Sequence, residues 1–200
     1  MAKARIAVLV SGGGTNLQAL INAQESGVIT SGTIALVISN NPDAYALERA
    51  DNARIHTEVV LKKQLGSQSA FEQRIKDLLQ EHKIDLIVLA GFMSILSEEF
   101  TKDFPERIIN VHPSLIPSFC GKGYYGLRVH EEALRYGVKV TGATVHFVNE
   151  IPDGGRIIMQ KAVDILDTDT PETLQKRVME QAEWIILPAA VEQVSKQLIG

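Results

Sequence analysis

Strand-length apolar runs alternate with helical patterns over the first 112 residues, and this alternation constrains the fold more than any other feature. The runs are rich in Val, Ile and Leu, as expected for buried strands. The alternation favours an α/β fold: an open, mostly parallel, twisted sheet with helices on both faces, of the Rossmann-like kind. The expected strands are residues 6–10, 33–39, 54–60, 86–90 and 108–111, and the expected helices are residues 15–25, 44–52 and 69–82.

The second half of the chain departs from this alternation. Residues 113–126 hold two prolines and three glycines, and such an irregular stretch is usually functional or mobile. Strands at 143–149 and 156–163 flank a glycine-containing loop, which predicts an antiparallel hairpin. A helix is expected at 127–136, and a last helix is expected from Pro171, where Pro188 should kink or break it.

Composition excludes several classes of protein. The 200 residues carry 20 basic and 24 acidic side chains, a net charge of -4, and no long basic run, so we expect no nucleic-acid partner. No stretch of about 18 apolar residues exists, so we expect no membrane span. The single cysteine, Cys120, and the lack of a signal-peptide pattern favour a cytoplasmic protein. The oligomeric state, monomer or homodimer, is left open.

Asn110 and His112 form a polar pair at the end of the run 108–111. Side chains alternate along a strand, so both point to the same face, and Pro113 ends the strand. Ligands of open α/β sheets gather at the carboxyl ends of strands. An amide donor beside a titratable imidazole can hold an oxyanion and move a proton. A strand end with two satisfied polar groups would give the same pattern.

Residues 11–16, Ser-Gly-Gly-Gly-Thr-Asn, join the first strand to the first helix. Glycines let backbone N–H groups approach an anion, and the start of a helix adds partial positive charge, so the loop predicts a phosphate site. A tight strand-to-helix turn without a ligand is the alternative interpretation, but such a turn needs fewer than three successive glycines. Leu17 replaces the last glycine of a Gly-x-Gly-x-x-Gly pattern, and residues 39–41 hold no acidic residue, which disfavours a nicotinamide dinucleotide.

Asp153 lies in the glycine-containing loop between the last two expected strands. An aspartate in a turn is common without any catalytic role. If the loop folded over His112, however, the carboxylate would orient the imidazole and raise its pKa. The local sequence leaves both interpretations open.

The other histidines are weaker candidates. His56 and His82 lie near the ends of expected elements, and His130 lies among charged residues of a helix, so all three are expected at the surface. His146 stands in a strand and is expected to be a satisfied core residue, although it could face the same cleft. No spacing of His, Cys and Asp matches a zinc site, so no metal is expected.

Four segments carry a further signal when they are taken in order. They are residues 11–16, residues 89–93 (Leu-Ala-Gly-Phe-Met), residues 110–117 (Asn-Val-His-Pro-Ser-Leu-Ile-Pro), and residues 144–148 (Thr-Val-His-Phe-Val) with Asp-Gly-Gly at 153–155. Together they resemble the phosphoribosylglycinamide formyltransferases, folate-dependent enzymes of purine synthesis, over residues 5–190. The resemblance implies the formyltransferase fold in one domain, residues 1–200, with a phosphate-binding half at about 1–106 and a catalytic and folate-binding half at about 107–200.

The resemblance also implies a reaction. The formyl group of 10-formyltetrahydrofolate passes to the amine of N1-(5-phospho-D-ribosyl)glycinamide (glycinamide ribonucleotide) in IMP biosynthesis, which leaves tetrahydrofolate. Asn110 and protonated His112 match the pair that stabilises the oxyanion, and Asp153 matches the carboxylate that raises the histidine pKa and helps relay a proton. Glu183 matches a residue at the ribonucleotide. The implied ligand contacts are Gly14, Thr15 and Asn16 for the phosphate, and Met93, Ser94, Ile95, Leu96, Asn110, Asn149, Glu150, Ile151, Pro152 and Asp153 for the folate.

The chain departs from the family pattern at one binding position. Gln68 stands where many members carry a basic residue toward the folate tail, although Lys62 and Lys63 lie nearby. Cys120 matches no catalytic role.

Three alternative functions remain. A formyltetrahydrofolate hydrolase shares the Asn/His/Asp set but usually has a regulatory domain first, whereas here the first strand begins near residue 5. A methionyl-tRNA formyltransferase adds a carboxyl-terminal domain, for which a chain ending at Gly200 leaves no room. A non-catalytic nucleotide-binding module would leave the Asn/His/Asp set without a role.

Overall fold

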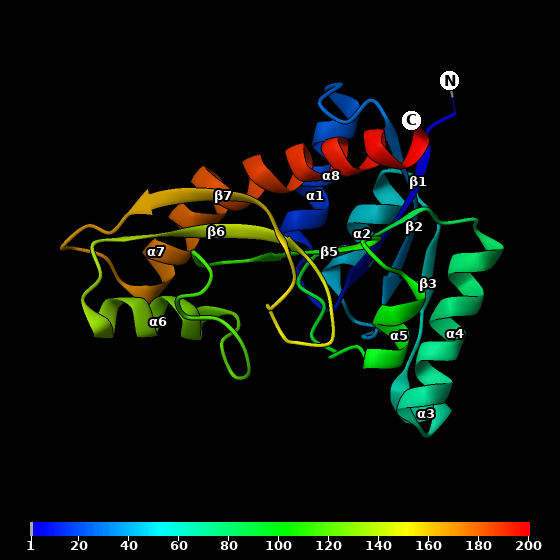
Figure 1. The fold of residues 1–200 in the computed structure, drawn as a ribbon, viewed down its shortest axis with the longest axis horizontal. Helices are drawn as coiled ribbons and strands as arrows, with labels where there is room; N and C mark the ends of the chain where they lie inside the picture. Colours follow the sequence, from blue (N-terminus) through cyan, green and yellow to red (C-terminus); the bar gives the residue numbers. More distant parts are fainter. Residues whose placement is uncertain (1) are drawn as a thin grey trace.

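The computed structural model describes residues 2–200, in which seven strands form one sheet (Figure 1). The strands are β1 (Ala4–Val10), β2 (Gly32–Ser39), β3 (Thr57–Val59), β4 (Leu86–Leu89), β5 (Ile108–His112), β6 (Val140–Phe147) and β7 (Ile157–Asp164). Their order is β3-β2-β1-β4-β5-β6-β7. The first five are parallel, whereas β6 runs antiparallel to both β5 and β7. The predicted mostly parallel sheet and the predicted hairpin are therefore confirmed.

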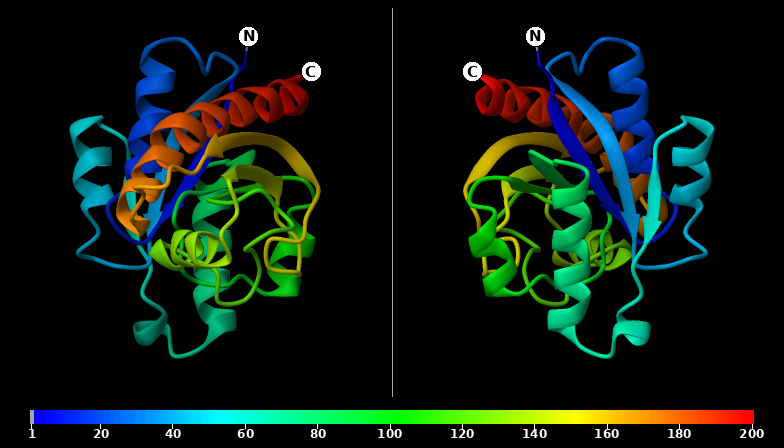
Figure 2. Two further views of the ribbon diagram at one scale, coloured as in Figure 1. Left: turned by 90° about the vertical axis from the view of Figure 1, so that its left-hand side faces the viewer. Right: turned by 90° about the vertical axis from the view of Figure 1, so that its right-hand side faces the viewer.

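Helices cover both faces of the sheet, as two views from opposite sides show (Figure 2). The helices are α1 (Thr15–Glu25), α2 (Tyr45–Asn52), α3 (Lys62–Leu65), α4 (Gln68–Glu81), α5 (Glu98–Asp103), α6 (Leu127–Tyr136), α7 (Pro171–Val178), the π-helical segment η1 (Met179–Glu183) and α8 (Trp184–Ile199). The described N-terminal end and the C-terminus lie close together, at the same end of β1 (Figure 1).

The alternation of side chains along β1 divides the core into two layers. Ile6, Val8 and Val10 pack with α1, α2 and α8, whereas Ala7 and Leu9 pack on the opposite face with α4 and α5. All five side chains are fully buried. The predicted stripe of α4 lies in this second layer, since it is made of Phe71, Ile75, Leu78 and Leu79. Two buried faces explain why the parallel strands read as continuous apolar runs.

Several predicted boundaries were wrong. Residues 54–56 are not part of β3, because Arg54 adopts a left-handed conformation with φ of 57° in the turn that follows α2. β6 begins at Val140 and ends at Phe147, so Asn149 lies in the loop rather than in the strand. The helices α3 and α5 were not predicted, because four and six residues are too few to show a helical period.

The sequence predicted that Pro188 would kink or break the last helix, but the helix does not end there. Pro188 lies inside α8, and the departure from α-helical geometry comes earlier, in η1. A π-turn holds an additional residue and often occurs at functional sites. Here it separates α7 from α8 and ends at Glu183.

Within residues 2–200, no helix has both the length and the apolar character needed to cross a membrane.

Candidate active site

A cleft of about 740 Å³ opens at the carboxyl ends of β4 and β5. Asn110 and His112 reach it from β5, and Asp153 reaches it from the loop between β6 and β7. The other walls are residues 91–95, which follow β4, and residues 121–126 of the irregular loop. The structure therefore brings together the three residues that the sequence suggested for chemistry.

A tight turn places Asp153 over the cleft. Ile151 accepts a hydrogen bond from the N–H of Gly154 (2.9 Å), with Pro152 and Asp153 at the two central positions. Asp153 has a φ of 57°, a left-handed conformation that aspartate tolerates better than most residues. Gly155 is required next, because a Cβ there would lie 1.7 Å from the carbonyl oxygen of Phe147.

Hydrogen-bond acceptors face both ring nitrogens of His112. Nε2 lies 2.9 Å from the carbonyl oxygen of Phe119, and Nδ1 lies 3.5 Å from Oδ2 of Asp153. The same Oδ2 accepts a hydrogen bond of 2.8 Å from the N–H of Gly121. A neutral ring can donate to one of these acceptors, whereas a protonated ring can donate to both.

The net effect on the His112 pKa differs from the expectation. Burial lowers the pKa of this imidazole, which is 4% exposed, and the charge of Asp153 and the carbonyl of Phe119 raise it by less. The His112 pKa therefore lies below its ordinary value. Burial raises the pKa of Asp153, but the rings of His146 and His112 and the N–H of Gly121 together lower it by more than burial raises it. The Asp153 pKa therefore lies below its ordinary value, and the carboxylate is ionised at neutral pH.

His146 fixes the orientation of Asn110. The antiparallel register places the two residues opposite each other, and Asn110 Nδ2 lies 3.2 Å from His146 Nε2. His146 Nδ1 lies 2.8 Å from the carbonyl oxygen of Phe147, to which it donates. A neutral ring in that tautomer accepts from the amide at Nε2, which leaves the second N–H of Asn110 for a ligand. The same Nε2 also lies 3.6 Å from Oδ1 of Asp153. The predicted core position of His146 is confirmed, since it is 1% exposed.

A second cavity of about 350 Å³ lies at the glycine loop. Gly14 stands before α1 with a φ of 71°, and residues 11–16, Gly91, Met93 and Gln175 are among its lining. Gly91 and Met93 also line the main cleft, so the two cavities adjoin. The predicted phosphate-binding residues Gly14, Thr15 and Asn16 therefore lie at a cavity that continues into the cleft.

Glu183 lies beside this loop but does not line the cavity. Its carboxylate is 6% exposed, and Oε2 accepts a hydrogen bond of 2.7 Å from Nδ2 of Asn16. Burial raises the pKa of Glu183, and the bond from Asn16 offsets part of this increase. In the described part of the chain, Oδ1 of Asn16 has no hydrogen-bond partner.

Nine of the ten predicted folate residues surround a smaller pocket of about 140 Å³ that shares a wall with the main cleft. They are Ser94, Ile95, Leu96, Asn110, Asn149, Glu150, Ile151, Pro152 and Asp153. The tenth, Met93, lies at the cleft and at the glycine loop. Apolar walls with a few polar groups suit an aromatic ligand with polar edges.

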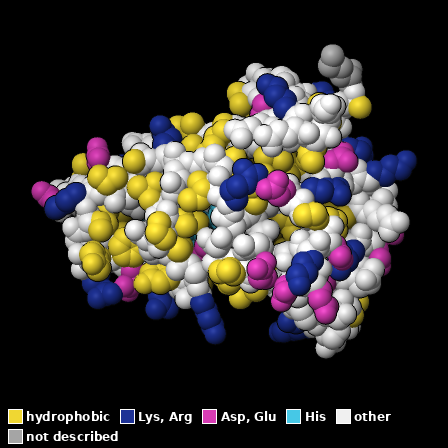
Figure 3. Space-filling model, in the orientation of Figure 1, with side chains coloured by type: hydrophobic (Ala, Val, Ile, Leu, Met, Phe, Trp, Pro, Cys, Tyr) yellow, Lys and Arg dark blue, Asp and Glu magenta, His cyan; other side chains and the backbone are white. Residues whose placement is uncertain are grey.

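Hydrophobic side chains gather on the half of the surface that carries β6, β7 and α6, whereas charged side chains are more frequent around α3 and α4 (Figure 3). Met93, Ile95 and Tyr125, which line the cleft, are 58%, 71% and 62% exposed. Such exposed apolar groups around a cleft are typical of a ligand site.

Two features of the site region were not predicted. His130 was expected to be solvated, but it is fully buried, and burial followed by the charge of His112 lowers its pKa to about 4. The loop residues Lys122, Tyr124 and Tyr125 form part of the cleft wall.

Gln68, which stands where many family members carry a basic residue, is held by contacts within the chain. Its Nε2 donates to Oε1 of Glu72 at 2.6 Å and to the carbonyl oxygen of Ile95 at 3.1 Å.

Comparison with known proteins places the chain in a family. The sequence profile of the formyl transferase family matches residues 4–191. The chain belongs to the formyl transferase family. A phosphoribosylglycinamide formyltransferase of Haemophilus influenzae is 45% identical over 94% of this chain and 85% of its own length. A glycinamide ribonucleotide transformylase of Symbiobacterium toebii has the same fold, with a TM-score of 0.91 and 41% identity over 98% of this chain and 89% of that one.

Longer relatives also match this chain. The human trifunctional purine biosynthetic protein adenosine-3 is 45% identical over 96% of the chain, but the match spans 18% of the human protein. The chicken trifunctional protein gives the same share of its length, at 46% identity. The formyl transferase unit thus occurs both in relatives of similar length and as part of larger proteins.

Within residues 2–200, no group of three or more His, Cys, Asp or Glu side chains is arranged to hold a metal ion.

Proposed function

We propose that this chain transfers the formyl group of 10-formyltetrahydrofolate to the amine of glycinamide ribonucleotide, which gives the formylated ribonucleotide and tetrahydrofolate in purine biosynthesis. The observation that carries the proposal is the meeting of Asn110, His112 and Asp153 at a cleft that adjoins the glycine loop. Membership of the formyl transferase family, and the names of relatives of similar length, support it.

Asn110 and His112 are the proposed donors to the developing oxyanion. Attack of the amine on the formyl carbon places negative charge on the formyl oxygen, and a positioned donor contributes about 3–4 kcal/mol at that point. Asn110 has one N–H left after its contact with His146. In this structure the carbonyl oxygen of Phe119 is the hydrogen-bond partner of His112 Nε2. We propose that the formyl oxygen replaces this carbonyl as acceptor.

Asp153 is proposed to hold the second proton of His112 and to take part in moving the proton of the attacking amine. Its carboxylate faces Nδ1 at 3.5 Å, and its lowered pKa keeps it ionised. The carboxylate opposes the effect of burial on the imidazole, since burial favours the neutral ring and Asp153 favours the charged one. Protonated His112 can donate from Nε2 to the oxyanion while Nδ1 still donates to Asp153.

The two substrates are proposed to enter from opposite ends of the cleft. The N–H groups at Gly14, Thr15 and Asn16 suit the phosphate, with Glu183 at the ribonucleotide. The pocket around Ile95, Leu96 and residues 149–153 suits the ring of the folate, which brings its formyl group to Asn110. Holding the amine and the formyl carbon together supplies much of the acceleration.

The test is a reaction of the purified chain with glycinamide ribonucleotide and 10-formyltetrahydrofolate. Formylated ribonucleotide and tetrahydrofolate in equal amounts are expected. Release of formate without the amine would instead favour a hydrolase. Binding of the ribonucleotide without turnover would favour a nucleotide-binding module, and either outcome contradicts the proposal.

Three further properties stay predictions. A cytoplasmic location is consistent with the single cysteine. The monomeric or dimeric state and the division into two halves near residue 106 are the other two.

A further inference from the structure

Helix α2 supports the glycine loop from behind. The N–H of Ala46 donates to the carbonyl oxygen of Gly12 at 3.0 Å, and Nε of Arg49 donates to the carbonyl oxygen of Gly13 at 2.8 Å. The backbone of Gly14 packs so closely on Ala46 that a Cβ at Gly14 would lie 2.6 Å from the Ala46 Cβ. Two successive carbonyl groups of the loop are therefore held toward α2.

This orientation decides where the N–H groups of the loop point. In a planar trans peptide, the C=O of one residue and the N–H of the next point in opposite directions. With the carbonyls of Gly12 and Gly13 directed at α2, the N–H groups of Gly13 and Gly14 point away from it. In the part of the chain that the structure describes, no hydrogen bond occupies these two N–H groups. Both residues line the 350 Å³ cavity, so these donors are available to an anion.

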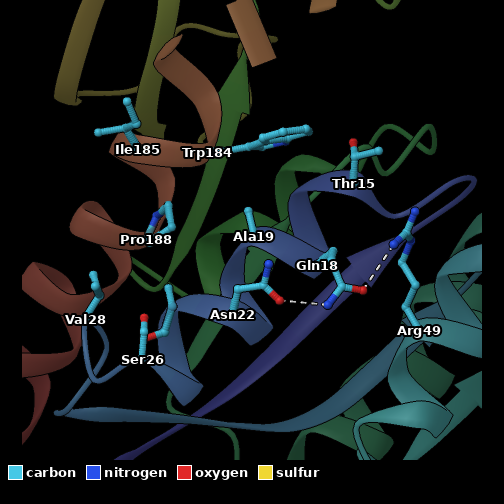
Figure 4. A pocket seen from close by; sticks show the side chains of 11 residues that line it. Thr15, Gln18, Ala19, Asn22, Ser26, Val28, Arg49, Trp184, Ile185 and Pro188 are labelled. Atoms are coloured by element: carbon cyan, nitrogen blue, oxygen red, sulfur yellow. Dashed lines mark hydrogen bonds between the residues drawn. The ribbon is translucent and has the colours of Figure 1, made fainter. Parts of the chain in front are cut away.

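The Arg49 guanidinium is itself fixed. It donates from Nη1 to Oε1 of Gln18 at 3.1 Å, and Gln18 donates to Oδ1 of Asn22 at 2.9 Å, so a chain of hydrogen bonds connects α2 to α1 (Figure 4). It also lies over the Tyr45 ring, at 4.9 Å from its centroid. A planar guanidinium with several N–H donors can bond the loop and α1 at the same time. The compact ammonium group of a lysine cannot reach both acceptors in this way.

Arg49 also supplies charge where the cavity wall has none. Over residues 2–200, the wall of the glycine-loop cavity includes no lysine or arginine. A bound phosphate would therefore depend on loop N–H groups, on the start of α1 and on cations behind the loop. Arg49 bonds the loop directly, so its positive charge acts at short range.

We propose that Arg49 is a positioning residue for the phosphate of the substrate: by its bond to the carbonyl oxygen of Gly13, it orients the peptide group between Gly13 and Gly14 so that the N–H of Gly14 faces the anion. The inference rests on the proposed function for the identity of the substrate. It adds a residue outside the glycine loop to the binding of the ribonucleotide.

The experiment compares Arg49→Met, which keeps the aliphatic stem, with Arg49→Lys and with Arg74→Met as a control. Arg74 lies on α4, 41% exposed, with one loose ion pair to Glu81 at 3.6 Å. Calorimetry measures the dissociation constants of glycinamide ribonucleotide and of the same riboside without phosphate. Steady-state kinetics measure kcat and the KM of each substrate, and thermal melting confirms folding.

Arg49→Met is expected to weaken ribonucleotide binding about ten-fold or more, in line with loss of a charged hydrogen bond. Riboside binding, kcat and the KM for the folate should change less than two-fold, because the loss concerns the phosphate alone. Arg49→Lys should lie between wild type and Arg49→Met, and it decides the question if Arg49→Met does not fold. Arg74→Met should match wild type.

Three results would overturn the inference: ribonucleotide affinity of Arg49→Met within two-fold of wild type, an equal loss for ribonucleotide and riboside, or a wild-type chain that does not bind the ribonucleotide. If the wild type binds the ribonucleotide in an Arg49-dependent way but makes no formylated product, the proposed function fails and the role of Arg49 stands.

Discussion

Oδ2 of Asp153 lies 3.5 Å from Nδ1 of His112. The contact joins a strand end to a loop 41 positions later, and the N–H of Gly121 bonds the same oxygen from the irregular loop. The carboxylate thus connects the three segments that surround the cleft. Changes in any one of them should therefore reach the protonation of the imidazole.

Asp153→Asn should lower turnover about 100-fold or more and shift its pH dependence. The carboxylate raises the His112 pKa, so its removal lets burial lower that pKa further. Turnover that needs the protonated ring declines as pH rises through this pKa, so the decline should move to lower pH. Profiles of kcat from pH 5 to 9 measure the shift. Asp103→Asn, at an exposed ion pair with Lys76, is the control, and a profile unchanged in Asp153→Asn would refute the coupling.

Gly14→Ala should destabilise the chain and weaken ribonucleotide binding. A Cβ would lie 2.6 Å from the Ala46 Cβ, and the φ of 71° is strained for alanine, so we expect a loss of about 1–3 kcal/mol. Gly12→Ala is the matched control, because no heavy atom of the described chain lies within 4 Å of its added Cβ. Urea unfolding of both variants measures the difference, and equal stabilities would contradict the close packing of α2 on the loop.

Glu183→Gln should stabilise the chain at pH 8 while it weakens ribonucleotide binding. A raised pKa means that the stability contributed by the protonated acid is present below the ordinary pKa and is lost as pH rises through the folded-state value. Glutamine resembles the protonated acid, so the gain should be about 1 kcal/mol at pH 8 and should shrink on acidification. Glu180→Gln, exposed in the same π-helical segment, serves as control for the unfolding measurements. A variant less stable than wild type at pH 8 would argue against a costly buried charge.

His130 should make the chain sensitive to acid. Its pKa falls from an ordinary 6.5 to about 4, so the stability it contributes is present above pH 6.5 and is lost as pH falls toward 4. The shift corresponds to about 3 kcal/mol over that range. Unfolding free energies at pH 7.5, 6 and 5 should therefore fall less steeply in His130→Gln than in wild type. Parallel slopes for the two proteins would disprove this role of His130.

Local patterns were sufficient for the parts of the fold that depend on local chemistry. Continuous runs of Val, Ile and Leu predicted the parallel strands, and the stripe from Phe71 to Leu79 predicted the buried face of α4. The alternation rule also placed Asn110 and His112 on one side of β5, and both line the cleft. The glycine loop was predicted from its position between strand and helix.

Other parts depend on contacts that no local pattern encodes. His146 lies opposite Asn110 because of the register in which β6 pairs with β5. This register could not be predicted from the sequence of either strand alone. The reach of Asp153 to His112 depends on a turn and on a distant loop. The π-helical turn before Pro188 was likewise invisible, because no residue pattern distinguishes it from an ordinary helix.

His130 is a different case, because a signal was available. Its neighbours Arg128 and Glu131 suggested a solvated helix face. Leu127 and Leu134 stand three positions before it and four after it, however, which puts His130 on the apolar stripe of α6. Reading the helical period rather than the adjacent residues would have predicted its burial.

The most direct test of the central claim is the single-turnover rate of formyl transfer in His112→Ala, measured together with the dissociation constant of glycinamide ribonucleotide. We predict a rate that falls about 1000-fold or more, because a donor to the oxyanion is lost, with ribonucleotide affinity within about three-fold of wild type. A rate near that of wild type, or a loss confined to affinity, would contradict it.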